Sequence, residues 1–347
     1  MRRTTASPAL VALSLVTGAV SQDSLSSKPG LAYIDTHEDD IDLLLSAKSS
    51  ISWYYTWSLY ASPEINATVP FVPLVHGLSD VSSLDSINDL PATSRYLLTV
   101  SNSRALIPGM SLTAYFNEPD GTTSSGGSSI SPSDAAQAYI DSIVPLRTSS
   151  SRTWKISHPS VTGSDQGLAW LREFNSACWN IDPNNGCPAD FIAMHWYGDF
   201  AGLASWLGTL REYYTTDSSS GAVDPDNMKY WFTEMALPQQ SEDDTASMMN
   251  QSMNYLDGLD YVQAYAWYGA FRKGASADSF TGDNVALFNK KGALTDVGAM
   301  YLGGKKEGFK AGMTGSASAG LGRSGSGCGL IVFAAVATAF TVFMNLW

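Results

Sequence analysis

The sequence has few of the residues that hold metal ions in proteins, with three cysteines and four histidines among 347 residues. They form no cluster with the ligand spacing of a zinc site, so we expect no metal centre, and no cofactor is implied. Basic residues are also scarce, because 20 Lys and Arg stand against 33 Asp and Glu, and the formal net charge is −13. A chain this acidic disfavours nucleic acid and anionic surfaces as partners and suits a neutral polymer such as a polysaccharide.

The N-terminal segment predicts secretion. Arg2 and Arg3 precede an apolar stretch, and small residues follow at Ala19-Val20-Ser21. This is the pattern of a secretory signal peptide, which we expect over residues 1–21, with cleavage before Gln22.

The C-terminal segment predicts a lipid anchor. Residues 307–328 form a spacer rich in Gly, Ser and Ala, and residues 329–347 form an apolar tail that no basic residue follows. This order is typical of a glycosylphosphatidylinositol (GPI) signal whose tail is removed, with attachment within residues 315–318. A single transmembrane helix is the alternative, since the tail is nearly long enough to span a bilayer. The predicted location is therefore the cell surface or cell wall.

Secretion bears on two further kinds of site. Cys328 would leave with the tail, so Cys178 and Cys187 remain as an even pair in an oxidising compartment and predict a disulfide. Asn66 and Asn250 begin glycosylation sequons, a three-residue pattern that also occurs by chance.

Residues 22–306 are long enough for one catalytic domain with a full core. Short apolar runs alternate with segments of helical period, which indicates βα units and a parallel sheet. Eight strands are predicted, at residues 30–34, 52–57, 71–75, a run ending near 117, 155–158, 190–197, 229–234 and 261–268. Helices are predicted at residues 39–47, 133–144, 167–177, 201–214 and 243–256. The predicted fold is an α/β (β/α)8 TIM barrel.

Two glutamates end predicted strands. Glu118, in Asn117-Glu118-Pro119-Asp120, ends the fourth, and Glu234, in Trp231-Phe232-Thr233-Glu234, ends the seventh. A barrel carries its catalytic groups at the C-terminal ends of its strands, and cleavage of a glycosidic bond requires two facing carboxylates. We predict a catalytic pair, with two surface glutamates as the alternative.

Aromatic side chains gather at the same strand ends. Such rings stack on sugars, although core packing is the alternative for each of them. We expect core packing for Trp170, Trp206 and Trp231, which we place on helices or on the helix-facing side of a strand. The predicted sugar-binding residues are Trp53, Trp57, His195, Trp196, Tyr197 and Trp267.

Over about residues 30–301 the sequence resembles glycoside hydrolase family 128. The segments that carry the resemblance, in order, are Trp53-Tyr54-Tyr55-Thr56-Trp57, Phe71-Val72-Pro73-Leu74-Val75, Phe116-Asn117-Glu118-Pro119-Asp120, Asp190-Phe191-Ile192-Ala193-Met194-His195-Trp196-Tyr197-Gly198, Trp231-Phe232-Thr233-Glu234 and Tyr265-Ala266-Trp267-Tyr268-Gly269. The resemblance implies a retaining β-1,3-glucanase on a clan A barrel. We write the activity as endo-β-1,3-glucanase, although the sequence leaves exo action open.

The resemblance also implies a role for each matching residue. Glu118 matches the acid/base and Glu234 the nucleophile. Asn117 matches an asparagine whose amide binds the sugar 2-hydroxyl, and Tyr197, paired with His195, is placed to hydrogen-bond the nucleophile. Trp267 matches the platform under the reacting sugar.

In the mechanism that follows, Glu234 attacks the anomeric carbon while Glu118 protonates the leaving oxygen, and Glu118 then deprotonates the incoming water. Retention requires the carboxyls to lie about 5–5.5 Å apart. The predicted partner is β-glucan, bound by a monomer. A β-1,3-glucan transglycosylase and a catalytically impaired glucan-binding surface protein are the alternatives.

The sequence departs from the family in two places. His76 stands where the family often carries a tryptophan. Residues 100–115 separate Tyr96-Leu97-Leu98-Thr99 from Phe116, where the family runs straight through. We interpret this segment as a retained intron or an insertion. If it is translated, either residues 97–100 or residues 112–116 serve as strand four.

Overall fold

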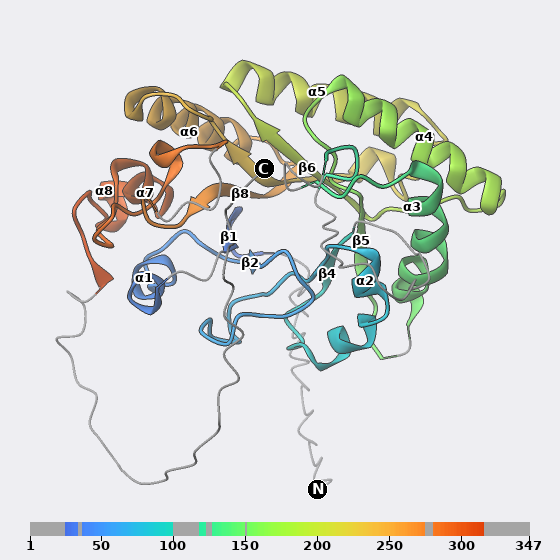
Figure 1. Ribbon diagram of the computed structural model, residues 1–347, viewed down its shortest axis with the longest axis horizontal. Helices are drawn as coiled ribbons and strands as arrows, with labels where there is room; N and C mark the ends of the chain where they lie inside the picture. The colour runs from blue at the N-terminus through green and yellow to red at the C-terminus, as the bar shows by residue number, and fades with distance from the viewer. Residues whose placement is uncertain are drawn as a thin grey trace, which may run out of the picture.

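A computed structural model describes residues 25–33, 37–99, 118–122, 127–149, 151–274 and 280–315 (Figure 1). Eight strands, all parallel to their neighbours, form one sheet in the order β2-β1-β8-β7-β6-β5-β4-β3. The strands are β1 (Pro29–Tyr33), β2 (Tyr54–Tyr55), β3 (Leu74–Val75), β4 (Tyr96–Thr99), β5 (Lys155–His158), β6 (Phe191–Tyr197), β7 (Lys229–Ala236) and β8 (Val262–Ala270).

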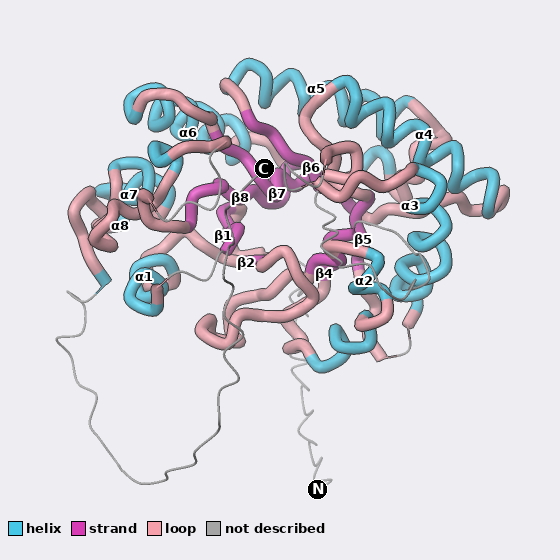
Figure 2. The backbone as a smooth tube through the Cα atoms, in the orientation of Figure 1, coloured by secondary structure: helices cyan, strands magenta, loops and turns pink. Residues whose placement is uncertain are grey.

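The sheet closes on itself where its two edge strands meet. Tyr54 forms an isolated parallel bridge with Phe71, and its amide donates to the carbonyl of Pro70 at 3.0 Å. The amide of Val72 donates back to the carbonyl of Tyr54 at 2.9 Å. Figure 2 shows the ring of strands with helices outside it. The predicted (β/α)8 barrel is confirmed.

The helices are α1 (Glu38–Leu44), α2 (Leu78–Val81), α3 (Pro132–Ala138), α4 (Asp165–Ile181), α5 (Phe200–Thr216), α6 (Glu242–Asp257), α7 (Asp296–Tyr301) and α8 (Gly304–Glu307). Five of them begin after a residue whose side-chain oxygen accepts a hydrogen bond from an amide of the first turn, which satisfies a donor that the helix leaves unpaired. These N-cap residues are Ser131, Ser164, Asp199, Ser241 and Thr295. The loops that carry the caps follow strands, so they lie at the C-terminal mouth of the barrel.

Large rings fill the barrel interior, where small residues on neighbouring strands make room for them. Trp231 packs against Trp53, Tyr96 and Phe191 with ring centroids 5.0, 4.8 and 4.8 Å away. Ala32, Ala193, Ala264 and Ala266 belong to the same buried cluster. A second and larger cluster lies between the strands and the helices.

The expectation that Trp231 packs on the helix-facing side of its strand is wrong. Regular two-residue alternation counted back from Glu234 places Phe232 inside the barrel and Trp231 outside. The pairing of β7 with β8 shifts register between Phe232 and Met235, so Trp231 and Glu234 both face inward and Phe232 packs outward.

The fourth strand also differs from its prediction. β4 is Tyr96–Thr99, which corresponds to the alternative of residues 97–100 and not to a run ending near Asn117. It pairs with β3 through Leu98 and Thr99 and with β5 through Tyr96 and Leu97, so the ring is complete at this point. Residues 100–117, including Asn117, lie outside the described part of the chain.

A disulfide joins Cys178 and Cys187, as predicted, and closes a short loop between α4 and β6. A loop of this length stabilises the fold by about 2–3 kcal/mol on chain-entropy grounds. Asn66 and Asn250 are both exposed. The expected signal peptide and the apolar tail lie outside the described residues, among which no helix has the length and apolar character needed to cross a bilayer.

His158 makes folding sensitive to acid. It is fully buried, with Nδ1 2.9 Å from the hydroxyl of Tyr214 and Nε2 2.8 Å from the carbonyl of Cys187. Burial lowers its pKa from 6.5 to about 4, against the opposing hydrogen bond to Cys187. The unfolded chain therefore takes up a proton at this side chain below about pH 6.5, whereas the folded chain does so only near pH 4.

We expect this difference to lower the free energy of unfolding by roughly 3 kcal/mol as the pH falls from 6.5 to 4. Denaturant titrations across this range measure it, and His158→Gln, which keeps a donor and an acceptor, is the comparison. The free energy of unfolding should change less steeply with pH in the variant, by an amount that corresponds to the uptake of up to one proton. Equal slopes in the two proteins would show that His158 does not carry the effect.

Candidate active site

Glu234 lies near the C-terminal end of β7 and is 2% exposed. The pairing of β6 with β7 sets His195 beside it, and Tyr197 follows two residues further along β6. Tyr55 ends β2, and Trp57 follows in the loop after that strand. Strands that are far apart in the sequence thus bring four side chains to one carboxylate.

Three of these side chains donate hydrogen bonds to Glu234. The hydroxyl of Tyr197 donates to Oε2 at 2.5 Å, and the indole Nε1 of Trp57 donates to Oε1 at 2.7 Å. The hydroxyl of Tyr55 shares its proton between Oε1 at 3.3 Å and the carbonyl of Thr233 at 3.1 Å. Burial, followed by the charge of Glu234, raises the pKa of Tyr55 and of Tyr197 well above 10, so both keep their protons as donors. Hydrogen bonds of this kind hold the carboxyl group in one orientation.

Trp57 reaches Glu234 from a strained backbone. Its φ is +52°, a region that a bulky side chain rarely adopts. Its ring packs against Tyr55 at 4.8 Å and edge-on against Tyr268 at 5.9 Å. Strain held by surrounding contacts is common where a side chain must point at a reacting group.

Glu118 faces Glu234 across His195. Nδ1 of His195 lies 3.1 Å from Oε1 of Glu118 and 3.6 Å from Oε2 of Glu234. One side-chain ligand atom of each of the three residues lies within 4.8 Å of the others. The two carboxyl groups therefore approach within 4.8 Å at their nearest oxygens, which is closer to the separation of about 5–5.5 Å in retaining glycosidases than to the 6.5–9.5 Å in inverting ones.

His195 is buried between the two carboxyl groups. Burial alone would lower its pKa, but the charge of Glu234 and the hydrogen bond to Glu118 outweigh burial and raise the pKa above 6.5. The imidazole therefore carries a proton more readily than a free histidine does. A protonated ring donates from Nδ1 to Glu118 and offsets the repulsion between the two acids.

Glu118, His195 and Glu234 also have the composition of a metal site. Both oxygens of Glu234, however, already accept hydrogen bonds from N–H and O–H groups that point at them. A cation would have to displace these donors. The donor arrangement therefore fits an ionised, reactive carboxylate better than a metal ligand.

Asp120 ties the segment of Glu118 to the loop after β5. Its Oδ1 accepts from the amide of Thr162 at 2.9 Å, and its Oδ2 accepts from the Thr162 hydroxyl. Glu118 itself has a φ of +53°, and its carbonyl accepts from the amide of Gly121 at 2.8 Å. The tie to Thr162 and this tight turn together set the direction of the Glu118 side chain.

The structure brings His195, Tyr197 and Trp57 to the two glutamates, but it places three other predicted sugar-binding residues elsewhere. Trp53 and Trp267 are fully buried, and their indole N–H groups donate to the carbonyls of Lys28 and Val285. A ring must be exposed to stack on a sugar, so neither of them has a face for substrate here. Trp196 is half-buried on the outer side of β6, against the first turn of α5.

Strand geometry explains the positions of Trp53 and Trp196. Trp53, Tyr55 and Trp57 all face inward, but each successive pair of residues along a strand climbs roughly 6.6 Å toward the mouth. Trp53 therefore lies deep in the barrel and only Trp57 reaches the site. Trp196 alternates with His195 and Tyr197 and faces the helices instead.

Sequence reasoning missed Tyr55, Asp120 and Phe280 as residues of the site. The ring of Phe280 lies 5.6 Å from that of Tyr197 and is 57% exposed at the mouth. Tyr55 and Asp120 belong to two of the motifs that carry the family resemblance. The strand alternation, which puts Tyr55 on the same side as Trp53 and Trp57, could have identified Tyr55. Phe280 lies in the loop that follows β8, and nothing in the sequence around it distinguishes it from an ordinary loop residue.

Comparison with known proteins gives a family and a fold. The family model described as glycosyl hydrolase catalytic core matches residues 30–301. The chain is also similar to alkali-sensitive linkage protein 1 of Schizosaccharomyces pombe, with 30% identity over 290 residues, which is 80% of this chain and 45% of that protein. It thus spans less than half the length of this relative.

Two solved structures of glycoside hydrolase family 128 have the same barrel. One is an exo-β-1,3-glucanase of subgroup VI from Aureobasidium namibiae, with a TM-score of 0.61, 22% identity, and coverage of 81% of this chain and 98% of that one. The other is an endo-β-1,3-glucanase of subgroup IV from Lentinula edodes, with a TM-score of 0.58, 23% identity, and coverage of 79% and 98%. At these identities the likeness establishes the fold.

Proposed function

The chain belongs to the glycosyl hydrolase catalytic core family, and from that premise we propose that it is a retaining β-1,3-glucanase that acts on cell-wall polysaccharide. The observation that carries this proposal is the facing pair of Glu118 and Glu234, with carboxylate oxygens within 4.8 Å of each other. The names of the solved neighbours support the β-1,3 linkage, since those proteins are β-1,3-glucanases. The acidic composition supports a neutral substrate.

In the first step, an oxygen of Glu234 attacks the anomeric carbon and the glycosidic bond breaks. The leaving oxygen takes the proton of Glu118. In the second step, Glu118 removes a proton from water, the water oxygen attacks the anomeric carbon, and Glu234 is released. Two inversions at one carbon give net retention.

The neighbouring side chains orient the two glutamates and balance their charge during these steps. Tyr197, Trp57 and Tyr55 donate hydrogen bonds that orient Glu234 for attack. His195 lies within 3.6 Å of both carboxyl groups, and in its protonated form it balances the second carboxylate when Glu118 alternates between acid and base. Phe280 offers an exposed ring beside Tyr197 on which a neighbouring sugar unit could stack.

The direct test is reducing-end release from soluble β-1,3-glucan, followed by chain-length analysis of the products. Hydrolysis produces new reducing ends and shorter chains. Transglycosylation produces longer chains with few new ends, and a binding protein produces neither. A β-1,4-glucan serves as the linkage control, and equal release from both polymers would contradict β-1,3 specificity.

We also propose that the protein is secreted and held at the cell surface by a GPI anchor. The support is the sequence at the two ends, in residues 1–21 and 307–347. Phosphatidylinositol-specific phospholipase should release the protein from membranes. A C-terminal peptide that ends in Trp347, detected by mass spectrometry in the mature protein, would contradict the anchor.

A prediction for Asp120 follows from its contacts with Thr162. We expect Asp120→Ala to lower kcat about 10²-fold with little change in KM, because a shift of about 1 Å in a catalytic group has an effect of this size. The loss should be larger for natural glucan, whose leaving group needs protonation by Glu118, than for an activated aryl glycoside. Asp120→Asn, which keeps one acceptor, should recover part of the rate. An equal loss on both substrates would indicate a general folding defect and not misplacement of Glu118.

A further inference from the structure

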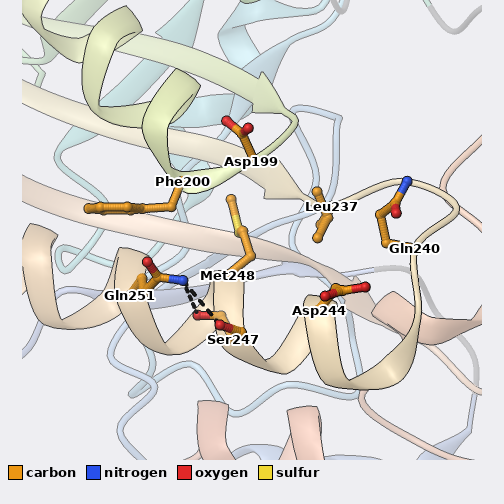
Figure 3. Close-up of a pocket in the computed structure, with 8 residues that line it drawn as sticks. All are labelled: Asp199, Phe200, Leu237, Gln240, Asp244, Ser247, Met248 and Gln251. Atoms are coloured by element: carbon orange, nitrogen blue, oxygen red, sulfur yellow. Dashed lines mark hydrogen bonds between the residues drawn. The ribbon is translucent and has the colours of Figure 1, made fainter.

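A cavity apart from the candidate active site opens between α6 and the start of α5 (Figure 3). Its volume is about 560 Å³, within the range of small-molecule sites. It contains none of the catalytic side chains. The residues that line it are Asp199, Phe200, Leu237, Gln240, Asp244, Ser247, Met248 and Gln251.

One face of a helix forms the floor of this cavity. Asp244, Ser247, Met248 and Gln251 follow the i, i+3, i+4, i+7 spacing that aligns side chains along an α-helix. Figure 3 shows Phe200 and Leu237 opposite this row. The ring of Phe200 is held by an edge-on contact with Tyr255, at a centroid distance of 5.5 Å. The cavity is open to solvent, and its partly or fully buried members are Phe200, Leu237 and Met248.

The lining combines apolar surface with hydrogen-bonding groups and includes no cation. Asp199 and Asp244 each use one carboxylate oxygen in a helix cap, and the other oxygen has no hydrogen-bond partner among the described residues. Two carboxylates without a basic residue disfavour phosphate and other anions. A neutral pyranose fits better, because its C–H face would pack on Phe200 and Met248 while its hydroxyls would meet the carboxylates and the amide of Gln240. The amide of Gln251 would join them through its oxygen, since its Nε2 donates to Ser247.

One loop, residues 237–241, separates the cavity from the strand that carries Glu234. Leu237, which lines the cavity, follows Glu234 by three residues. Gln239 joins this loop to residues 280–281. Its backbone amide donates to the carbonyl of Thr281 at 3.1 Å, and its side-chain Nε2 donates to the carbonyl of Phe280 at 3.1 Å. Phe280 contacts Tyr197, whose hydroxyl donates to Glu234. The lining residues Asp199 and Leu237 follow β6 and β7, so the cavity opens at the same end of the barrel as the two glutamates. A polymer longer than the active site is the kind of ligand that would occupy both.

We infer that this cavity is a second binding site for β-glucan, which holds a sugar unit of the polymer outside the cleavage site. The inference rests on the proposed function for the identity of the polymer. The cavity would help to hold long or insoluble glucan chains. A short oligosaccharide bound at the glutamates would not extend over residues 237–241 and would not use it.

The test fills the cavity with a large side chain. Ser247→Trp places an indole on its floor, and Asn254→Trp is the matched control, exposed on the same helix but outside the lining. Binding to insoluble β-1,3-glucan is measured in a Glu234→Gln background, and kcat/KM on a β-1,3-linked trisaccharide in the active protein. We expect Ser247→Trp to weaken polymer binding about 10-fold and to leave kcat/KM on the trisaccharide unchanged. The control should change neither quantity.

A double variant, Gln240→Ala with Gln251→Ala, removes two hydrogen-bonding groups and covers the case in which Ser247→Trp does not fold. It too should weaken polymer binding with normal trisaccharide cleavage. Unchanged polymer binding in the folded variants overturns the inference, and so does a parallel loss of binding and trisaccharide cleavage. If the wild-type protein binds glucan through this cavity but releases no reducing ends, the proposed hydrolysis fails and the second site stands.

Discussion

Replacing Glu234 with glutamine is expected to lower kcat by at least ~10⁴-fold while β-1,3-glucan still binds. The amide has nearly the shape of the carboxylate and can still accept hydrogen bonds from Tyr197 or Trp57, so the mouth of the barrel should keep its form. What is lost is the nucleophile, which acts on bond formation more than on ground-state binding.

Reducing-end release and an insoluble-glucan binding assay measure the two halves of this prediction. Glu173→Gln is a suitable control, because Glu173 is an exposed glutamate on α4 away from the site. The control should retain full activity. Hydrolysis near the wild-type rate in Glu234→Gln would remove Glu234 from the role of nucleophile.

The barrel was predictable because its signals are local and repeated. Most predicted strands match their observed positions closely, and Ser and Asp residues cap the helices that follow them. The position of Glu234 was predictable for a related reason, whereas Glu118 ends no strand in the described part of the chain. Since every parallel strand ends at the same mouth, a glutamate that ends β7 must lie there whatever the details of packing.

Depth within the barrel was not predictable from alternation. The two-residue period tells which side of a strand a residue faces, but Trp53 and Trp57 face the same side at different heights. The register shift in β7 is a second example, because it depends on the pairing with β8 and leaves no mark on the local sequence of Trp231. Both errors came from tertiary geometry.

Long-range contacts explain the residues that were missed. Asp120 acts through Thr162, which lies 42 positions away in the sequence, and Tyr55 reaches Glu234 across 179 positions. A short motif indicates that such residues matter without revealing their partners. The three-dimensional arrangement therefore adds the positioning residues to a catalytic pair that the sequence had already suggested.

Replacing Glu118 with alanine should give a pattern that depends on the leaving group. Natural glucan requires protonation of the departing oxygen, so its turnover should fall by about 10³-fold, within the usual contribution of general acid catalysis. A substrate such as the dinitrophenyl β-glycoside of a β-1,3-linked oligosaccharide has a good leaving group, and that group departs without the proton of Glu118. Its first step should survive, and the glycosyl-enzyme intermediate on Glu234 should accumulate because no base activates water.

Azide distinguishes this role from a loss of structure. It is a nucleophile that needs no deprotonation, and it can enter the space that the Glu118 side chain leaves, so it should accelerate the second step. The expected product is the β-glycosyl azide, since attack on the intermediate inverts the centre a second time. Glu234→Gln treated in the same way should yield none of this product, because it forms no covalent intermediate. An equal loss on natural and activated substrates in Glu118→Ala, without azide rescue, would show that Glu118 supports the site in another way, and the assignment of the two glutamates would have to be reconsidered.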